Sequence, residues 1–276
     1  MIDSRLLSGL RRRFPDRSAE GGTAPLVPGR QVVPALWVSD GAAPEGLWQR
    51  LHREHGAGSG LWPLLLDPKS GGDGPHLDGQ DLGLAPGGPA PHGHDPAALL
   101  RGWWERAVLW CPTGDPQERA ELLEMLEPFG AVWPGLAPAV EHAASSLPNP
   151  QDCADALARQ LLRGRPGLRI GLVRADGGAQ ALAACGWNGT NGHGDSGAVA
   201  AVLRSWQERF GARLVQAGPD SLHLSVAAPP TGLREALPVA AEHAAFCPDN
   251  LFQCDEGLAG YAGELVDEGC WSFWWD

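Results

Sequence analysis

The stretch EHAAFCPDN, residues 242–250, concentrates side chains that could do chemistry. Its histidine and cysteine, His243 and Cys247, stand four residues apart, so on a helix they lie on neighbouring turns and can touch. A cysteine beside a histidine can act as a nucleophile with its base. Asp249 follows in the same stretch, and His223 lies on an upstream strand where it could serve as a general base. We therefore take His223, His243, Cys247 and Asp249 as candidate catalytic residues.

The position of Cys247 at the end of its helix argues against a reactive thiolate. The partial negative charge at a helix C-terminus disfavours the ionised thiol, and Pro248 then stops the helix. On a helical wheel Glu242 lies opposite the apolar face, so we expect it to face solvent or another domain. A small buried thiol is the favoured interpretation of Cys247, because free cysteines are among the most buried residues.

A metal site is the other interpretation of these residues. His243, Cys247 and Cys254 could supply ligands, with His223 as a fourth. The six cysteines form no C-x-x-C pair, and so no zinc-ribbon spacing. We predict no cofactor and no metal ligands, with zinc as the alternative. The histidines of PHGHDP, residues 91–96, fit a solvated loop before a helix better than a metal motif.

The glycine-rich loop GWNGTNGHGD, residues 186–195, could line a ligand pocket. It contains no lysine or arginine and matches no phosphate-binding motif, so an anion site is disfavoured. Its polar side chains at Asn188, Asn191 and His193 are the groups that could contact a ligand.

The aromatic stretch WSFWWD, residues 271–276, could form the wall of a cleft. In an extended chain Trp271, Phe273 and Trp275 share one face and Trp274 takes the other, so both faces carry aromatic rings. Core packing is the simpler explanation of these rings. Together the two stretches give the ligand-binding candidates Trp187, Asn188, Asn191, Trp274 and Trp275.

The elements that position these residues form a readable C-terminal pattern. We predict strand pairs and helices in the order ββαββα, with strands over 168–175, 180–187, 212–218 and 221–227 and a helix over 196–210. Glu208 and Arg209 should lie on the solvated side of that helix. Leu222 and Leu224 share one strand face, and His223 takes the other with Ser225. The pattern predicts an α+β fold with the helices on one face of the sheet.

The N-terminal part predicts a β-α-β-like half. The expected elements are a strand in VVPALWVSD, a helix in APEGLWQRLHREHG and a buried strand in LWPLLLD. The predicted organisation is a flexible tail over 1–28, an N-terminal half over 29–143 with a long Gly/Pro/His loop over 68–96, a linker over 144–150, and a C-terminal domain over 151–276.

The composition and net charge of the chain disfavour several classes of partner and location. The 276 residues carry a net charge of −12, which disfavours nucleic acid and anionic membranes as partners. The N-terminus lacks the apolar run of a secretory signal, and no stretch is long and apolar enough for a membrane helix. We therefore expect a cytoplasmic protein with reduced cysteines.

Several C-terminal motifs resemble the bacterial family called domain of unknown function 4253. They are LRSWQERFGARLV, SLHLSVAAPP, AEHAAFCPDN and WSFWWD, and the resemblance covers roughly residues 167–276. The resemblance implies no established activity. Some members of the family occur near toxin–immunity-type genes, which implies a binding role.

These observations favour a non-catalytic binding or interaction module, with an immunity-like role as one form, that holds a ligand in a groove between its halves. No nucleophile, base and orienting group assemble from the sequence, and the twelve tryptophans suit a recognition surface. The expected partner is a protein or a small molecule. The alternative is an enzyme acting on a small molecule or peptide, with its pocket around His223, His243, Cys247 and Asp249.

Overall fold

The computed structural model describes residues 27–68, 78–84, 93–109, 115–139 and 147–276. The predicted tail over 1–28 lies outside this part of the chain except for its last two residues. Most of the predicted loop over 68–96 and the first half of the predicted linker lie outside it as well.

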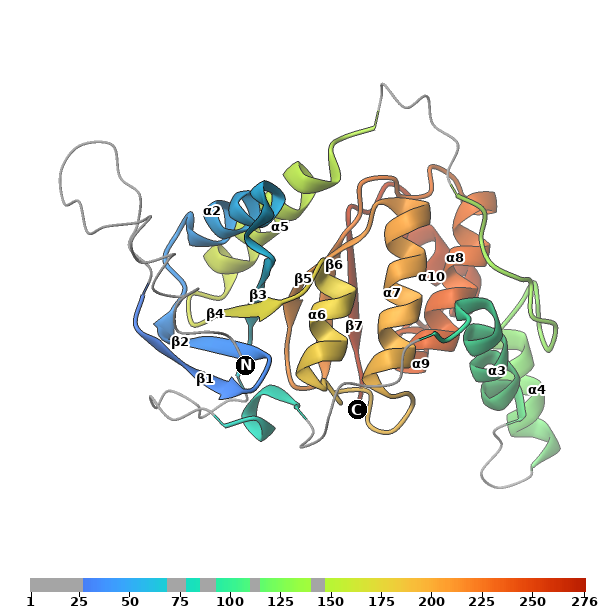
Figure 1. Ribbon diagram of the computed structural model, residues 1–276. Coiled ribbons are helices and arrows are strands. Elements are labelled where there is room, and N and C mark those ends of the chain that lie inside the picture. Colours follow the sequence, from blue (N-terminus) through green and yellow to red (C-terminus); the bar gives the residue numbers. More distant parts are fainter. Residues whose placement is uncertain (1–26, 69–77, 85–92, 110–114, 140–146) are drawn as a thin grey trace.

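A seven-stranded mixed sheet forms the centre of the fold (Figure 1), in the order β1-β2-β4-β3-β5-β6-β7. Its strands are β1 Gly29–Val33, β2 Leu36–Ala42, β3 Leu61–Leu66, β4 Arg169–Arg174, β5 Arg213–Ala217, β6 Ser221–Ser225 and β7 Cys270–Trp274. All neighbouring strands run antiparallel except β3 and β5. Strand β4 lies between β2 and β3, so one sheet takes strands from both sides of the predicted linker. The domain boundaries themselves stay a prediction.

Helices cover both faces of this sheet (Figure 1), which confirms the α+β class. Helices α2 Leu47–Glu54 and α5 Pro150–Gly164 pack on one face around a cluster that includes Trp48 and Leu157. A larger hydrophobic cluster on the other face includes residues of α3 Pro96–Leu109, α6 Gly178–Cys185, α7 Ser196–Phe210, α8 Leu233–Phe246, α9 Pro248–Phe252 and α10 Gly257–Glu264. Helix α4 Pro116–Met125 follows α3 at the end of the molecule. Within the segment where the pattern was predicted, α6 to α10 contribute to the cluster on one face as expected, and α2 and α5 cover the opposite face.

The predicted strand over 180–187 is also wrong, and with it the ββαββα order. Residues 178–185 form helix α6 instead. Alanine and leucine are strong helix formers, and four alanines within this segment outweigh its apolar alternation. Gly186 ends the helix in the left-handed conformation, with φ 67°. The C-terminal order is therefore β4-α6-α7-β5-β6-α8-α9-α10-β7.

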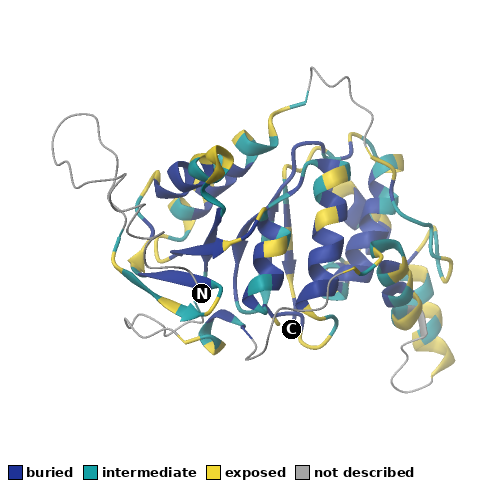
Figure 2. Ribbon diagram, in the orientation of Figure 1, coloured by how far each residue is buried: buried dark blue, intermediate teal, exposed yellow. Residues whose placement is uncertain are grey.

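Several other C-terminal elements form as predicted. Helix α7 runs to Phe210 and ends at Gly211, whose φ is 62°. The antiparallel pair β5–β6 forms as predicted, and Leu222 and Leu224 face the larger cluster. In β7 the alternate residues are buried and exposed in turn, and Figure 2 shows how deeply α7 is buried beside the sheet.

The N-terminal elements differ in one respect. The stretch VVPALWVSD forms a hairpin, because its segment Pro34–Ala35 turns the chain between β1 and β2. Helix α2 and strand β3 then follow, as the sequence predicts. The unit is β-α-β-like, with β4 inserted between its two parallel strands.

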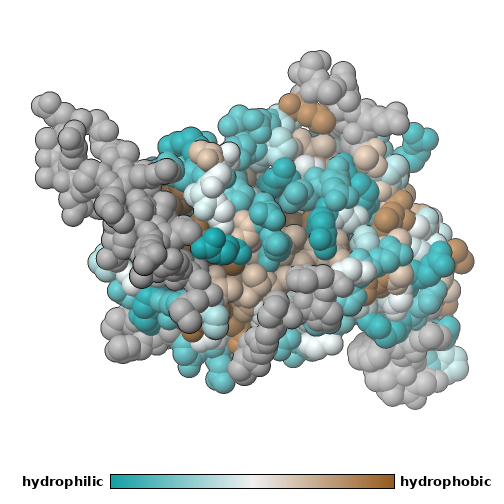
Figure 3. Space-filling model, viewed as in Figure 1, coloured by the Kyte–Doolittle hydropathy of each residue, from teal (hydrophilic) through white to brown (hydrophobic). Residues whose placement is uncertain are grey.

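Hydrophilic side chains predominate over the described elements on the face shown in Figure 3. Large hydrophobic side chains that stay exposed within the described residues include Leu233, Phe252 and Trp274. No helix in this part of the chain combines the length and the apolar character that crossing a bilayer requires.

Candidate functional site

His243 lies in an aromatic core and not in a pocket. Helix α8 buries it completely, and its ring is packed edge-on against Trp206, Trp271 and Phe273 at centroid distances of 4.6–5.0 Å. Its Nδ1 lies 3.0 Å from the hydroxyl of Tyr261. Burial, with the charge of a nearby arginine, lowers the pKa of His243 to about 3. The imidazole is therefore neutral at physiological pH and has no exposed surface to offer a substrate.

Cys247 and Asn250 cover the free edge of strand β7. The Cys247 thiol donates to the carbonyl of Trp274 at 2.9 Å. The Asn250 carboxamide donates to the carbonyl of Ser272 at 2.7 Å and to the hydroxyl of Tyr261. Burial raises the pKa of the Cys247 thiol to about 12, so it stays protonated. These bonds satisfy backbone groups that an edge strand leaves unpaired, and the favoured buried-thiol interpretation fits them.

Glu242 lies at the centre of a buried polar network. It is fully buried and forms a two-pronged ion pair with Arg209 of α7, with both N–O distances at 2.7 Å. The same carboxylate accepts hydrogen bonds from Trp206 Nε1 and from the amide of Ala137. Residues 133–138 of the predicted N-terminal half pack over this end of α7 and α8, which fits the expectation that Glu242 faces solvent or another domain. The solvated position expected for Arg209 is wrong, because its side chain is only 15% exposed.

His223 lies across the sheet from this aromatic core. It stands beside Gln216 on the face opposite Leu222, and its Nε2 is 3.1 Å from Arg165. Arg165 in turn pairs with Asp67 at 2.8 Å. Burial, with the charge of Arg165, lowers the pKa of His223 to about 4. The sheet separates His223 from His243 and Cys247, so the structure does not bring the four candidate catalytic residues into one pocket.

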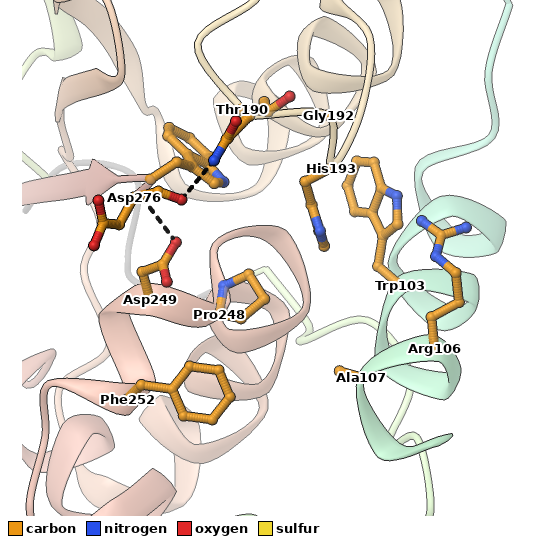
Figure 4. A pocket seen from close by; sticks show the side chains of 12 residues that line it. Trp103, Arg106, Ala107, Thr190, Gly192, His193, Pro248, Asp249, Phe252 and Asp276 are labelled. Atoms are coloured by element: carbon orange, nitrogen blue, oxygen red, sulfur yellow. Dashed lines mark hydrogen bonds between the residues drawn. The ribbon is translucent and has the colours of Figure 1, made fainter. Parts of the chain in front are cut away.

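A cleft lies between helix α3 and the C-terminal elements, and we call it the α3 cleft (Figure 4). Its volume is about 630 Å³. It is lined by Trp103, Arg106, Ala107, Thr190, Asn191, Gly192, His193, Pro248, Asp249, Phe252, Trp275 and Asp276. Helix α3 belongs to the predicted N-terminal half, and the other lining residues belong to the C-terminal domain. The cleft therefore occupies the place where we expected a groove.

The walls of the α3 cleft are fixed by internal contacts. His193 Nε2 lies 2.8 Å from the carbonyl of Ala245, and its ring packs against Trp103 with centroids 5.1 Å apart. Asn191 donates to the carbonyl of Asp276 at 2.7 Å, as Figure 4 shows by a dashed line. Asp249 accepts a longer bond, 3.3 Å, from the amide of Asp276. Burial lowers the pKa of His193, so the neutral ring is favoured.

Four of the predicted site residues lie in this cleft and the others do not. Asn191, His193, Asp249 and Trp275 line it. Trp187 is buried, packs against Trp275, and donates its indole hydrogen to the carbonyl of Gly218. The Asn188 side chain is exposed away from the described clefts.

Sequence reasoning missed the residues that α3 contributes. Trp103 and Arg106 stand three residues apart on one side of that helix, and both line the cleft. The motif WWER contained a signal for a contact on α3, because two adjacent tryptophans on a helix point in different directions and do not share one face. Phe252 was also missed, and its exposed fraction of 48% is high for an aromatic side chain.

A metal centre does not assemble in the described part of the chain. These residues contain no group of three or more His, Cys, Asp and Glu side chains placed to hold an ion. The alternative ligand set fails because the sheet separates His223 from His243, and the His243 Nδ1 is engaged by Tyr261. The absence of a cofactor stays a prediction.

The C-terminal elements that carry these contacts are the part of the chain with a family match. Residues 169–276 match the family described as a domain of unknown function (DUF4253). The match confirms the resemblance inferred from the C-terminal motifs. It spans β4 to the last residue, so the DUF4253 segment contributes every lining residue of the α3 cleft except those on α3. Comparison with curated proteins and with solved structures gave no match.

Proposed function

We propose that the protein is a non-catalytic binding module that holds a segment of a protein partner in the α3 cleft. One observation carries the proposal. The cleft between the predicted halves has an aromatic floor, Trp103 and Trp275, and a rim with exposed Phe252 and Arg106. Aromatic side chains and arginine are the residue types that protein interfaces favour.

The state of the reactive groups supports binding over catalysis. Cys247 is protonated and its thiol is engaged by Trp274, and His243 has no exposed surface. The Cys247 thiol contacts Asn250 and the Trp274 carbonyl, and neither group is a general base that could activate it. His193 faces the cleft but bonds the Ala245 carbonyl, which makes it a positioned wall residue.

The charges of the cleft suggest what the partner segment carries. Arg106 stands on the α3 side, and Asp249 and Asp276 stand on the opposite side (Figure 4). A segment with one apolar side chain, flanked by a basic group toward the aspartates and an acidic group toward Arg106, fits this order. An immunity-like role is one form that such binding could take.

Site-specific photo-crosslinking in the native host tests the proposal. The photoreactive analogue p-benzoylphenylalanine replaces Phe252 at the rim, and in a control it replaces Val132, which is 72% exposed and does not line the cleft. We expect one discrete crosslinked protein from position 252 and not from position 132. Arg106→Glu should reduce that product, because it reverses the charge on the α3 side.

Three results would contradict the proposal. Equal products from both positions would show non-specific contact. A crosslinked product that Arg106→Glu leaves unchanged would place the partner outside the α3 cleft. A crosslinked small molecule in place of a protein would keep the cleft as a binding site but reject a protein partner.

A further inference from the structure

A second cleft lies on the other side of α9, beside strand β7, and we call it the β7 cleft. Its volume is about 670 Å³. On its sheet side it is lined by Arg165, Ser221, His223, Cys270, Ser272 and Trp274. It shares no lining residue with the α3 cleft.

The strand register places one aromatic ring among polar side chains. In the β6–β7 pair, His223 is opposite Ser272 and Ser221 is opposite Trp274. These four side chains therefore share one face of the sheet, while Phe273 points to the aromatic core. Trp274 is 42% exposed on this face, so a flat ligand can reach its ring.

The contact with Arg165 determines which ring nitrogen of His223 carries the hydrogen. A guanidinium only donates, so His223 Nε2, 3.1 Å from Arg165 Nη2, must accept. The imidazole is then neutral with its hydrogen on Nδ1, and that buried donor has no partner among the described residues. Beside it, Gln216 is 0% exposed and neither atom of its carboxamide has a partner there. His223 lines the cleft, so a water or a ligand bound there can supply the bond that its Nδ1 hydrogen lacks.

The charges at the β7 cleft restrict the ligand. Arg165 is already paired with Asp67, and Glu264 and Glu268 also line the cleft. Excess negative charge disfavours an anion. A simple ammonium group is disfavoured as well, because it has no acceptor for the Nδ1 hydrogen of His223. Hydroxyl groups both donate and accept, so a neutral polyhydroxylated molecule satisfies these side chains.

We propose that the β7 cleft binds a neutral saccharide. The apolar face of the sugar ring stacks on Trp274, and its hydroxyls bond His223, Ser221 and Ser272. This site is independent of the proposed function, since the two clefts lie on opposite sides of α9 and share no residue.

Ligand-observed NMR tests this proposal. Saturation-transfer spectra are recorded with glucose, galactose, mannose and N-acetylglucosamine, and with glucuronate and glucosamine as charged counterparts. We expect transfer to at least one neutral sugar. Trp274→Ala should weaken its Kd by about tenfold or more, which corresponds to losing one good stacking contact. Trp274→Phe keeps a ring and should restore most of the affinity.

Phe252→Ala provides the matched control, because it removes an exposed ring of similar accessibility from the other cleft. It should leave sugar binding within about twofold, a change below 0.5 kcal/mol. No transfer to any neutral sugar would overturn the proposal, as would transfer to the charged sugars alone. A Trp274→Ala protein that stays folded and binds as tightly as the unmodified protein would overturn it too.

Discussion

Replacing Glu242 should cost more stability than any exposed carboxylate, because its side chain joins three parts of the fold. It accepts two bonds from Arg209, one from Trp206 and one from Ala137, at 2.6–2.7 Å. Glu242→Ala leaves the Trp206 indole and the Ala137 amide without that acceptor, and each lost bond should lower the free energy of unfolding by about 1–3 kcal/mol. It also leaves the Arg209 guanidinium without its carboxylate. The Arg209 side chain is only 15% exposed, and breaking such a buried ion pair costs about 3–5 kcal/mol.

These effects overlap, so we expect a loss of about 4 kcal/mol in the free energy of unfolding. For a chain of this size that lowers Tm by roughly 8–16 °C. Urea denaturation followed by tryptophan fluorescence measures the loss. Glu208→Ala is the matched control, since Glu208 is exposed one residue before Arg209, and it should change stability by less than about 0.5 kcal/mol.

A double-mutant cycle separates the ion pair from the individual side chains. Arg209→Ala leaves the carboxylate buried without its partner, so the double variant should be more stable than the sum of the two losses predicts, by at least about 1.5 kcal/mol. If Glu242→Ala costs less than about 1 kcal/mol, the inferred role of this carboxylate in holding residues 133–138 against α7 is refuted.

Three more predictions concern buried side chains in the C-terminal part. The folded-state pKa of His243 is about 3, below the unfolded value of about 6.5, so protons bind preferentially to the unfolded chain. The free energy of unfolding should therefore fall as pH drops from about 6.5 toward 3, by about 1.4 kcal/mol per pH unit for this group. Urea titrations at several pH values should show that the free energy of unfolding of His243→Gln depends less steeply on pH. Cys247 should resist iodoacetamide at pH 8 while the protein is folded, and mass spectrometry that finds it alkylated before unfolding would reject a buried, protonated thiol. Asn250→Ala uncovers the edge of β7 at Ser272 and should cost about 1–3 kcal/mol, whereas the exposed control Gln253→Ala should cost almost nothing by the same assay.

The parts of the fold that the sequence predicted well are those with a strong local signal. Helix α7 carries apolar residues at helical spacing and a glycine at its end, and both limits are correct. The alternation in β6 and β7 placed Leu222 and Trp274 on the correct faces. In these segments local pattern and tertiary packing agree, so the pattern suffices.

The errors arose where packing by a distant segment decides the outcome. The helical wheel put Glu242 on a polar face, but residues 133–138 cover that face and Arg209 neutralises the charge. Neither partner can be read from the helix alone. The strand predicted over 180–187 was wrong for a local reason. The alanines of segment 178–185 favour a helix, although the apolar residues alternate as in a strand.

Only part of the candidate site could be predicted, because some of its residues are brought there by the packing of a distant segment. Asn191, Asp249 and Trp275 were found because their stretches are rich in polar or aromatic groups. Trp103 and Arg106 were missed because α3 is more than eighty residues away in sequence and reaches the cleft only through the packing of α3 against α7 and α8.

The central claim is that the α3 cleft binds a partner, and one comparison tests it most directly. Untagged protein from its own host is measured by native mass spectrometry in three forms: unmodified, Ala107→Trp and Glu105→Trp. Ala107 lines the cleft, so a tryptophan there obstructs part of it (Figure 4), while the exposed Glu105 does not line it. We predict a bound protein on the unmodified and Glu105→Trp forms and none on Ala107→Trp. Equal binding by all three forms, or a bare chain in all three, would contradict the account.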